Sequence, residues 1–323
     1  MLIEHQIRVM RAIALGADLA ASMQALLATV AVQFRPVMSA VVKLEDDQQL
    51  QCIARFGIGE YANAWVEELC AGMAMTEIAA AIETGVFTAL DENSSPNLGR
   101  YLTSGGCSVC WVVPITLTAE KSFGALIMFH AEMQPLADRH HKLLDIYAIV
   151  AGLVANRHRL DAETHRLAYY DPLTGLPNRR LFSERLQMAL AARSADGRPL
   201  TVMFIDLDRF KDINDSEGHD VGDKVLQQIA KRIESCIGPD DTAARLGGDE
   251  FMLLVHSEGT DEELAQRLLE QIEQPIVVDD RIYSVSASIG MARFPDDGTD
   301  VESLWHHADE MMYRHKSQRS PQA

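Results

Sequence analysis

The sequence predicts an α+β protein made of two halves joined by one long helix. In the first half, an amphipathic helix precedes two pairs of strand-like runs. A heptad-spaced apolar seam then marks the long helix, and beyond it strand-like and helix-like segments alternate. The 323 residues suffice for two domains at about 150 residues per domain, each with its own core.

The first half reads as a helix packed on an antiparallel sheet. Residues 7–31 are rich in Ala, Leu and Met at helical spacing, and this pattern stops near Pro36. Two pairs of strand-like runs follow, and a turn-like segment separates the members of each pair. The runs are Ser39–Leu44 with Leu50–Phe56, and Cys110–Leu117 with Phe123–His130.

Residues 136–169 are expected to form the helix that links the two halves. Apolar side chains recur there at alternating intervals of three and four, at Leu143, Ile146, Val150, Leu153, Leu160 and Leu167. Such a seam favours a parallel dimeric coiled coil. Arg157 and Thr164 interrupt it, which leaves packing against its own domain as the alternative. The helix should end before Pro172, because the residue before a proline is pushed out of the helical region.

The second half is expected to be an α+β sandwich with helices on one face of a mixed sheet. The predicted helices are Arg180–Ala192, Asp223–Ile237, Glu262–Ile272 and Val301–Lys316. The predicted strands are Leu200–Leu207, Ala243–Leu246, Phe251–His256, Ile276–Val278, Arg281–Val285 and Ala287–Arg293. The expected domain boundaries are 1–135, 136–169 and 170–323.

The charge and the apolar pattern exclude several classes of protein. With 47 acidic and 29 basic residues, the formal charge is −18, which disfavours broad binding to nucleic acid. The sequence has no apolar run of the roughly 18 residues that a membrane span needs and no visible export signal, so we expect a cytoplasmic protein. Cys107 and Cys110 form a lone CxxC that reads as core packing rather than a redox or zinc site.

Two groups of carboxylates follow strand-like runs in the second half. The apolar run Thr201–Ile205 ends in Asp206-Leu-Asp208, and Gly247-Gly-Asp-Glu250 separates two short strands. A Gly-Gly pair permits the positive φ angles of a tight hairpin turn. If the strands are neighbours, the two groups converge and form a site suited to Mg²⁺ beside a polyphosphate. The alternative is a solvated acidic turn in an acidic protein.

The segment Arg245-Leu-Gly-Gly-Asp-Glu-Phe251 resembles the signature of GGDEF domains. Further blocks match this family in order along residues 166–316: Asp171-Pro-Leu-Thr-Gly-Leu-Pro-Asn178, Asp206-Leu-Asp-Arg-Phe-Lys-Asp-Ile-Asn214, Gly218-His-Asp-Val-Gly-Asp223, and Ser288-Ile-Gly290 with Ala308-Asp-Glu-Met-Met-Tyr313. The resemblance implies a palm-like (ferredoxin-like) catalytic domain. It also implies a homodimeric diguanylate cyclase, which joins two GTP molecules into cyclic di-GMP and releases two pyrophosphates.

The resemblance also implies a role for individual residues. The implied ligands of Mg²⁺ or Mn²⁺ are Asp206, the Leu207 carbonyl and Asp249, and Glu250 is implied either to bind the metal or to help deprotonate the attacking 3′-hydroxyl. Asp249 and Glu250 are thus the implied catalytic residues. Asn214 and Asp223 are implied to read the guanine edge. An ionised Asp accepts from guanine N1–H and the exocyclic amine together, a donor pair that adenine lacks. The implied phosphate contacts are the backbone N–H groups around Arg209, Phe210 and Lys211, and the Lys316 side chain.

The sequence departs from the family pattern at two places. A second basic residue usually follows the lysine by four positions, but Ser320 stands there and Arg319 precedes it, so whether Arg319 replaces it is open. The inhibitory product site of many relatives is Arg-x-x-Asp, whereas the matching stretch here runs from Gly238 to Asp241 and has no arginine. We therefore expect weak or absent product inhibition.

The first half resembles a GAF domain through its order of elements and two short blocks, Cys110-Trp-Val-Val-Pro-Ile115 and Phe123-Gly-Ala-Leu-Ile127. The resemblance implies a sensor that controls the dimer, and it leaves open whether a small molecule binds there. The alternative function is a degenerate GGDEF module that binds a nucleotide or a protein without catalysis.

Overall fold

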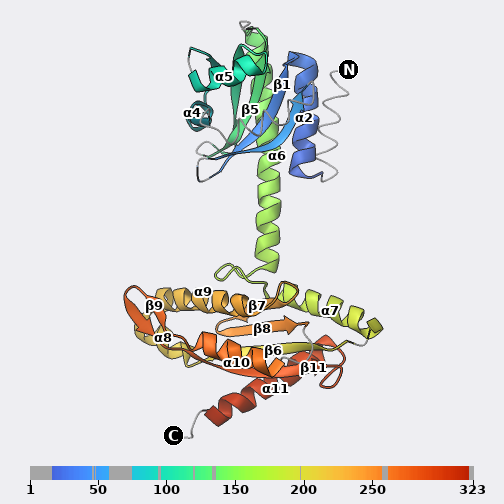
Figure 1. Ribbon diagram of the computed structural model, residues 1–323, viewed down its shortest axis with the longest axis vertical. Helices are drawn as coiled ribbons and strands as arrows, with labels where there is room; N and C mark the ends of the chain where they lie inside the picture. The colour runs from blue at the N-terminus through green and yellow to red at the C-terminus, as the bar shows by residue number, and fades with distance from the viewer. Residues whose placement is uncertain are drawn as a thin grey trace. The chain divides into compact units, whose positions relative to one another are not determined.

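The computed structural model describes residues 17–45, 47, 49–57, 75–93, 96–118, 121–132, 136–196, 198–256 and 261–319. The start of the first predicted helix, residues 7–16, lies outside these ranges, as does Ser320. The chain divides into two compact units, Met1–Ala162 and Glu163–Ala323, called here the N-terminal unit and the C-terminal unit (Figure 1).

The N-terminal unit is built on a five-stranded sheet in the order β2-β1-β5-β4-β3. Its strands are β1 Met38–Leu44, β2 Leu50–Gly57, β3 Thr88–Asp91, β4 Val109–Thr116 and β5 Ser122–His130. Every neighbouring pair in this sheet is antiparallel. The two predicted hairpins, β1 with β2 and β4 with β5, are therefore confirmed.

Helices cover both faces of this sheet (Figure 1). They are α2 Leu19–Phe34, α4 Met75–Thr84, α5 Pro96–Ser104 and α6 Asp138–Tyr169. Side chains of α2 and α6 share one core with the sheet, and those of α4 and α5 share the core on the opposite face. Cys107 and Cys110 are buried in this second core, and burial raises the pKa of both thiols, in agreement with the packing role expected of them.

The first turns of α6 pack on the sheet of the N-terminal unit. Gly152 lies so close to β4 that a Cβ atom there would stand 2.3 Å from the carbonyl oxygen of Thr116. Of the seam residues, Leu143 and Val150 pack against this core. The others are exposed, with 50% of Ile146, 66% of Leu153, 48% of Leu160 and 55% of Leu167 open to solvent. The helix thus has an apolar row without a partner in the described chain, and the coiled coil stays a prediction.

The C-terminal unit contains a four-stranded sheet in the order β11-β6-β8-β7 and a separate β9–β10 ribbon. Its strands are β6 Leu200–Asp208, β7 Thr242–Gly247, β8 Glu250–Val255, β9 Ile276–Val278, β10 Arg281–Tyr283 and β11 Ser286–Phe294. All pairings are antiparallel, so the predicted mixed sheet is wrong.

Helices also cover both faces of the four-stranded sheet, which corrects the prediction of one covered face (Figure 1). They are α7 Arg179–Asp196, α8 Phe210–Glu217, α9 His219–Cys236, α10 Asp261–Ile272 and α11 Val301–Arg319. Met203 and Ile205 of β6 point into the core with α9 and α10, whereas Val202 and Phe204 point into the core with α7 and α11. A strand that is apolar at every position needs cover on both sides.

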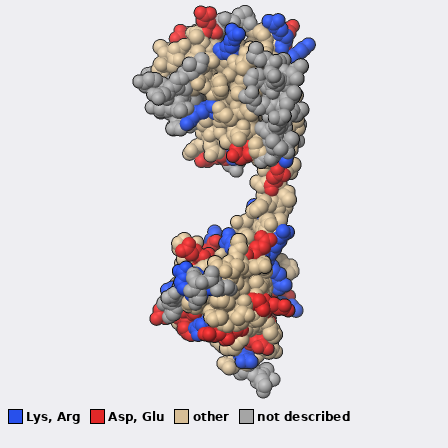
Figure 2. Space-filling model, turned by 90° about the vertical axis from the view of Figure 1, so that its right-hand side faces the viewer, with Lys and Arg blue, Asp and Glu red and all other residues tan. Residues whose placement is uncertain are grey.

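None of the described helices combines the length and hydrophobicity that crossing a bilayer requires. On the face drawn in Figure 2, Lys and Arg side chains of the C-terminal unit are interspersed with Asp and Glu. An anionic ligand therefore needs a local site, as the net charge already indicated.

Candidate active site

The predicted carboxylates meet at the end of β6. Asp206 is the register partner of Glu250 on β8 and of Ser288 on β11. Since side chains alternate along a strand, Asp206 lies on the same sheet face as Phe204, the face that α7 and α11 cover. The predicted convergence of the two carboxylate groups requires β6 and β8 to be neighbours, and they are.

The glycine turn that carries the second carboxylate group is held from two sides. Gly248 has φ of 55°, a conformation that favours glycine. Arg245 donates to the Gly248 carbonyl from Nε at 3.0 Å and from Nη2 at 2.8 Å. The same guanidinium donates from Nη1 to Asp171 Oδ1 at 2.9 Å. The Leu207 N–H donates to the Asp249 carbonyl at 3.2 Å, which ties the turn to β6.

Asp171 is thereby a structural anchor in the first matched block. Burial acts to raise its pKa, but hydrogen bonds from Thr174 and Arg245 outweigh burial and hold the pKa below its usual range. Asp171 and Arg245 are 17% and 10% exposed, so their ion pair is shielded from solvent. The sequence analysis matched both residues to the family without assigning this contact.

Lys316 reaches the carboxylate site from the end of α11. Its Nζ donates to Asp206 Oδ1, a contact between residues 110 positions apart. Burial raises the pKa of Asp206, and the bond from Lys316 offsets this only in part because the charges of Asp249 and Asp208 add to the rise. Burial acts to lower the pKa of Lys316, but its bond to Asp206 raises it overall. The carboxylates therefore attract a cation.

Glu250 stands among like charges. Burial is the largest cause that raises its pKa, and the negative charges of Asp206 and Asp249 raise it further. A divalent cation bound among these carboxylates would offset their mutual repulsion.

No group of three or more His, Cys, Asp or Glu side chains within the described ranges is arranged to hold a metal ion by itself. Magnesium seldom needs such a cage, because it keeps several waters and binds through one or two carboxylates plus substrate phosphates. The hard oxygen donors at this site, with pKa values raised by burial and further by neighbouring carboxylates, fit that mode.

Asp208 has a different role from Asp206, although the two share a strand face. Its oxygens accept from Ser286 Oγ at 3.1 Å and from Ser288 Oγ at 2.9 Å. Both serines lie on β11, so Asp208 fastens the neighbouring strand beside the site. The sequence analysis missed this role, although Ser288 lies in one of the matched blocks.

The residues implied to read guanine come from α8 and α9. Asn214 Oδ1 is buried and accepts no hydrogen bond within the described structure. A Cβ atom at Gly222 would stand 1.9 Å from this oxygen, so the glycine makes room for the Asn214 side chain. Asp223 follows Gly222 on α9 and is exposed. An orphaned acceptor beside an exposed carboxylate fits a base edge that offers N–H donors.

The segment that leaves β6 forms the start of α8, a helix that is absent from the predicted ones. Arg209 has φ of 56° and precedes the helix. Phe210 is 5% exposed and packs in the core, so only its backbone N–H is available to a ligand, whereas Lys211 is exposed. The first N–H groups of a helix have no acceptor within the helix, which suits phosphate oxygens.

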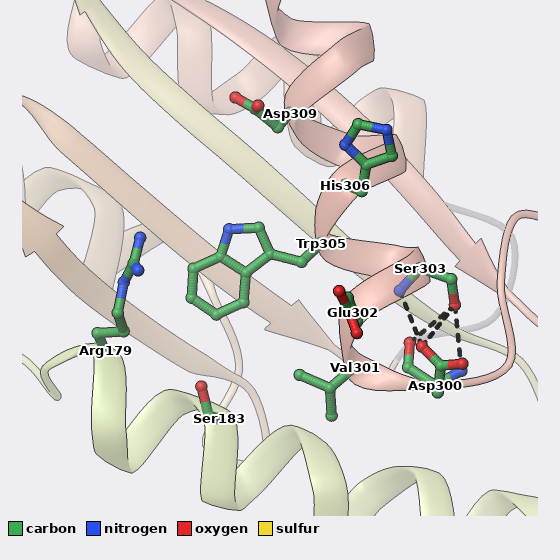
Figure 3. Close-up of a pocket in the computed structure, with 9 residues that line it drawn as sticks. All are labelled: Arg179, Ser183, Asp300, Val301, Glu302, Ser303, Trp305, His306 and Asp309. Carbon is green, nitrogen blue, oxygen red and sulfur yellow. Dashed lines mark hydrogen bonds between the residues drawn. The ribbon is translucent and has the colours of Figure 1, made fainter.

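An open cavity of about 870 Å³ lies between α7 and α11 (Figure 3). The Arg179 guanidinium stands 5.0 Å from the centre of the Trp305 ring. Arg179 acts to lower the pKa of Glu250, and Asp309 acts to raise it. Asp300 caps α11, since Ser303 N–H donates to its Oδ1 at 2.8 Å. None of these lining residues was assigned a role from the sequence, although Asp309 lies in one of the matched blocks.

Asp241, from the product site expected to be degenerate, uses both carboxylate oxygens in hydrogen bonds to nearby backbone N–H groups. Its Oδ2 accepts from the Gly238 N–H and its Oδ1 from the His256 N–H, both at 2.9 Å. The carboxylate therefore holds the loop before β7 against the end of β8.

We predict that calorimetric titration with cyclic di-GMP, in the presence of a non-hydrolysable GTP analogue, shows no saturable binding at this loop. A Gly238→Arg substitution is expected to create binding at this loop, because a Cβ at Gly238 stands 3.4 Å from Asp241 Oδ2 and therefore has room. Tight binding by the unmodified chain that Asp241→Asn abolishes would contradict this.

Lys316→Ala is expected to raise the Michaelis constant for GTP by about tenfold, the scale of one hydrogen bond to a charged group. Steady-state pyrophosphate release measures it. Lys316→Arg should retain most of the affinity, and Gln318→Ala on the exposed side of α11 serves as the control. An unchanged Michaelis profile for Lys316→Ala would remove this side chain from the substrate site.

Comparison with known proteins identifies the C-terminal unit. The family model described as "Diguanylate cyclase, GGDEF domain" matches residues 168–322. The bifunctional diguanylate cyclase/cyclic di-GMP phosphodiesterase MucR of Pseudomonas aeruginosa is 43% identical over 162 residues, which cover 50% of this chain and 24% of MucR. The diguanylate cyclase DgcP of Escherichia coli is 32% identical over 219 residues, 64% of this chain and 63% of DgcP. The chain thus spans less than two thirds of each of these relatives.

Among solved structures, a sensory box/GGDEF family protein from Caulobacter crescentus is 40% identical. It has a TM-score of 0.45 and covers 46% of this chain, and the chain covers 99% of it.

Proposed function

Residues 168–322 are a GGDEF domain of the diguanylate cyclase family, and on that premise we propose that this chain condenses two GTP molecules into cyclic di-GMP with release of two pyrophosphates. The observation that carries the proposal is the pairing of Asp206 with Glu250 across β6 and β8, where Lys316 already binds as a cation. We place the activity in the cytoplasm because GTP is its substrate.

Asp206, the Leu207 carbonyl and Asp249 would hold Mg²⁺ or Mn²⁺, which leaves the Glu250 carboxylate to act on the nucleophile. The cation would neutralise the triphosphate and polarise the phosphoryl group under attack. Lys316, which donates to Asp206 at the site, orients the phosphates, and the α8 N–H groups at Phe210 and Lys211 donate hydrogen bonds to the phosphate oxygens. In-line geometry depends on this fixed cradle.

Glu250 is proposed to take the proton of the 3′-hydroxyl. A general base works best when its pKa lies near the operating pH, and burial, the largest cause, raises the pKa of Glu250 in that direction. The opposing effects of Arg179 and Asp309 tune this value from the cavity between α7 and α11.

Guanine selectivity is assigned to Asn214 and Asp223. The orphaned Oδ1 of Asn214 and the exposed carboxylate of Asp223 accept hydrogen bonds from the guanine N1–H and exocyclic amine. Adenine would leave these acceptors unpaired, a penalty that supports strong discrimination.

Catalysis requires two GTP-loaded sites, so we propose a homodimer joined through α6. Ile146, Leu153, Leu160 and Leu167 are exposed and repeat every seven residues. This row fits one position of a parallel coiled coil. We further propose that the N-terminal unit is GAF-like and sets the geometry of this dimer, in support of which stands its helix-flanked antiparallel sheet leading directly into α6.

The proposal is tested by pyrophosphate release from GTP and Mg²⁺ by the purified full chain. We expect one pyrophosphate per GTP consumed, no turnover of ATP, none with EDTA, and specific activity that rises with protein concentration as dimers form. A degenerate module would bind GTP and release no pyrophosphate. A monomer with full specific activity at high dilution would contradict the dimer.

A further inference from the structure

The N-terminal unit contains a cavity of about 420 Å³, separate from the one between α7 and α11, and the proposed reaction assigns it no role. It lies where α2 ends, where β4 begins, where β5 ends and where α6 begins. Its volume falls within the range of about 300–1,000 Å³ that is typical of small-molecule sites.

Aromatic rings form its walls. The Trp111 and His130 ring centres are 4.0 Å apart with an angle of 41° between the planes. Phe34 and His140 meet edge to face at 5.8 Å. Burial lowers the pKa of His130 to about 4, so this ring is neutral at physiological pH and acts as a flat wall. Its Nε2 is buried without a hydrogen-bond partner in the described structure.

Two opposite charges complete the lining. Arg35 and Glu132 both line the cavity and both are exposed. Among the described contacts neither makes an ion pair or side-chain hydrogen bond, with the other or with any other residue. Arg35 also has φ of 48°, a strained conformation for a residue with a side chain. An unpaired guanidinium and an unpaired carboxylate beside an aromatic cavity suit a ligand that carries one negative and one positive charge.

We propose that this cavity binds a free aromatic α-amino acid. Its ring lies among Trp111, His130 and Phe34, where edge-to-face and offset contacts stabilise it. Its carboxylate pairs with Arg35, in the bidentate manner that guanidinium groups favour, and its ammonium pairs with Glu132.

The chemistry disfavours simpler ligands. An aromatic acid without an amine would leave Glu132 unpaired beside a second negative charge. An aromatic amine without a carboxylate would leave Arg35 unpaired beside a second positive charge. A metal ion is disfavoured because no cluster of three His, Cys, Asp or Glu side chains in the described ranges is arranged for one.

The cavity is lined in part by α6 itself. His140 lies in the first turn of α6 and lines the cavity together with Leu136 just before it. A ligand held against His140 therefore touches the helix that continues to Tyr169.

The test is isothermal titration calorimetry of the full chain, without GTP, against L-phenylalanine, L-tyrosine and L-tryptophan. At least one is expected to bind saturably. Phenethylamine, which lacks the carboxylate, and 3-phenylpropionate, which lacks the amine, are expected to bind at least about tenfold more weakly than L-phenylalanine, the loss of one charged hydrogen bond.

Variants assign the two charges. Arg35→Gln should weaken amino-acid binding by at least about tenfold and leave the affinity for phenethylamine unchanged. Glu132→Gln should weaken amino-acid binding to a similar extent and leave the affinity for 3-phenylpropionate unchanged. Arg139→Gln, an exposed neighbour that does not line the cavity, is the matched control. No saturable binding of any of the three amino acids, or equal affinity in the Arg35→Gln variant, overturns the proposal. Because calorimetry needs no turnover, this result is independent of the cyclase activity.

Discussion

Glu250→Gln is expected to abolish the condensation of GTP, with a fall in the rate of pyrophosphate release of about a thousandfold or more, the usual scale for losing a general base. Glutamine has the same shape, but it neither accepts the proton of the 3′-hydroxyl nor offers an anionic oxygen to a cation. Binding of a non-hydrolysable GTP analogue with Mg²⁺, measured by calorimetry, should persist, because Lys316, Asn214 and Asp223 are unchanged.

The same variant separates catalysis from folding. Burial and the charges of Asp206 and Asp249 raise the pKa of Glu250 in the folded chain. Between the unfolded and the folded pKa, the folded state binds more protons, so the wild-type stability decreases as pH rises through that window. Glutamine is always neutral, so the melting temperature of Glu250→Gln at neutral pH without divalent cations is expected to equal or exceed that of the wild type.

At acidic pH, below the unfolded pKa of Glu250, this difference in melting temperature should vanish. A variant that retains more than about a tenth of the wild-type rate would remove Glu250 from the chemistry. A variant that melts well below the wild type at neutral pH would show instead that the ionised carboxylate stabilises the fold.

Gly222→Ala is expected to raise the Michaelis constant for GTP by about ten- to a hundredfold and to weaken the preference for GTP over ATP, as expected when one or two hydrogen bonds to the base are lost. The new Cβ would stand 1.9 Å from Asn214 Oδ1 and 3.2 Å from the Phe210 ring, so the Asn214 side chain must leave its place. Competition between GTP and ATP in the pyrophosphate assay measures the selectivity.

Lys231→Ala is the control for Gly222→Ala, since it lies on an exposed position of the same helix. Circular dichroism with thermal melting shows whether the variant keeps the helix content and the stability of the wild type. An unchanged Michaelis constant together with unchanged selectivity would mean that Asn214 does not read the base.

The local patterns of the sequence predicted the elements that carry the carboxylates. The continuous apolar run before Asp206 predicted β6, and the glycine pair predicted the turn before Glu250. The contacts that complete the site depend on residues far apart in the chain. Lys316 meets Asp206 across 110 positions, and Arg245 meets Asp171 across 74. No local periodicity encodes such contacts, and the resemblance to the family was what pointed to Lys316, Arg245 and Asp171.

The errors have physical causes. The short helix α8 buries only Phe210, so its sequence has no apolar periodicity from which a helix could be predicted. The prediction of one covered face ignored the burial of β6 on both sides, which requires helices on both. In the N-terminal unit, α4, β3 and α5 have 10, 4 and 9 residues, too short for the apolar pattern to reveal them.

The most direct test of the central claim is the identity of the product made from GTP. The purified full chain is incubated with GTP and Mg²⁺, and the nucleotides are separated by chromatography and identified by mass, with Glu250→Gln in parallel. We predict cyclic di-GMP from the wild type and unreacted GTP from the variant. Unreacted GTP in both, or GDP as the sole product of the wild type, would contradict it.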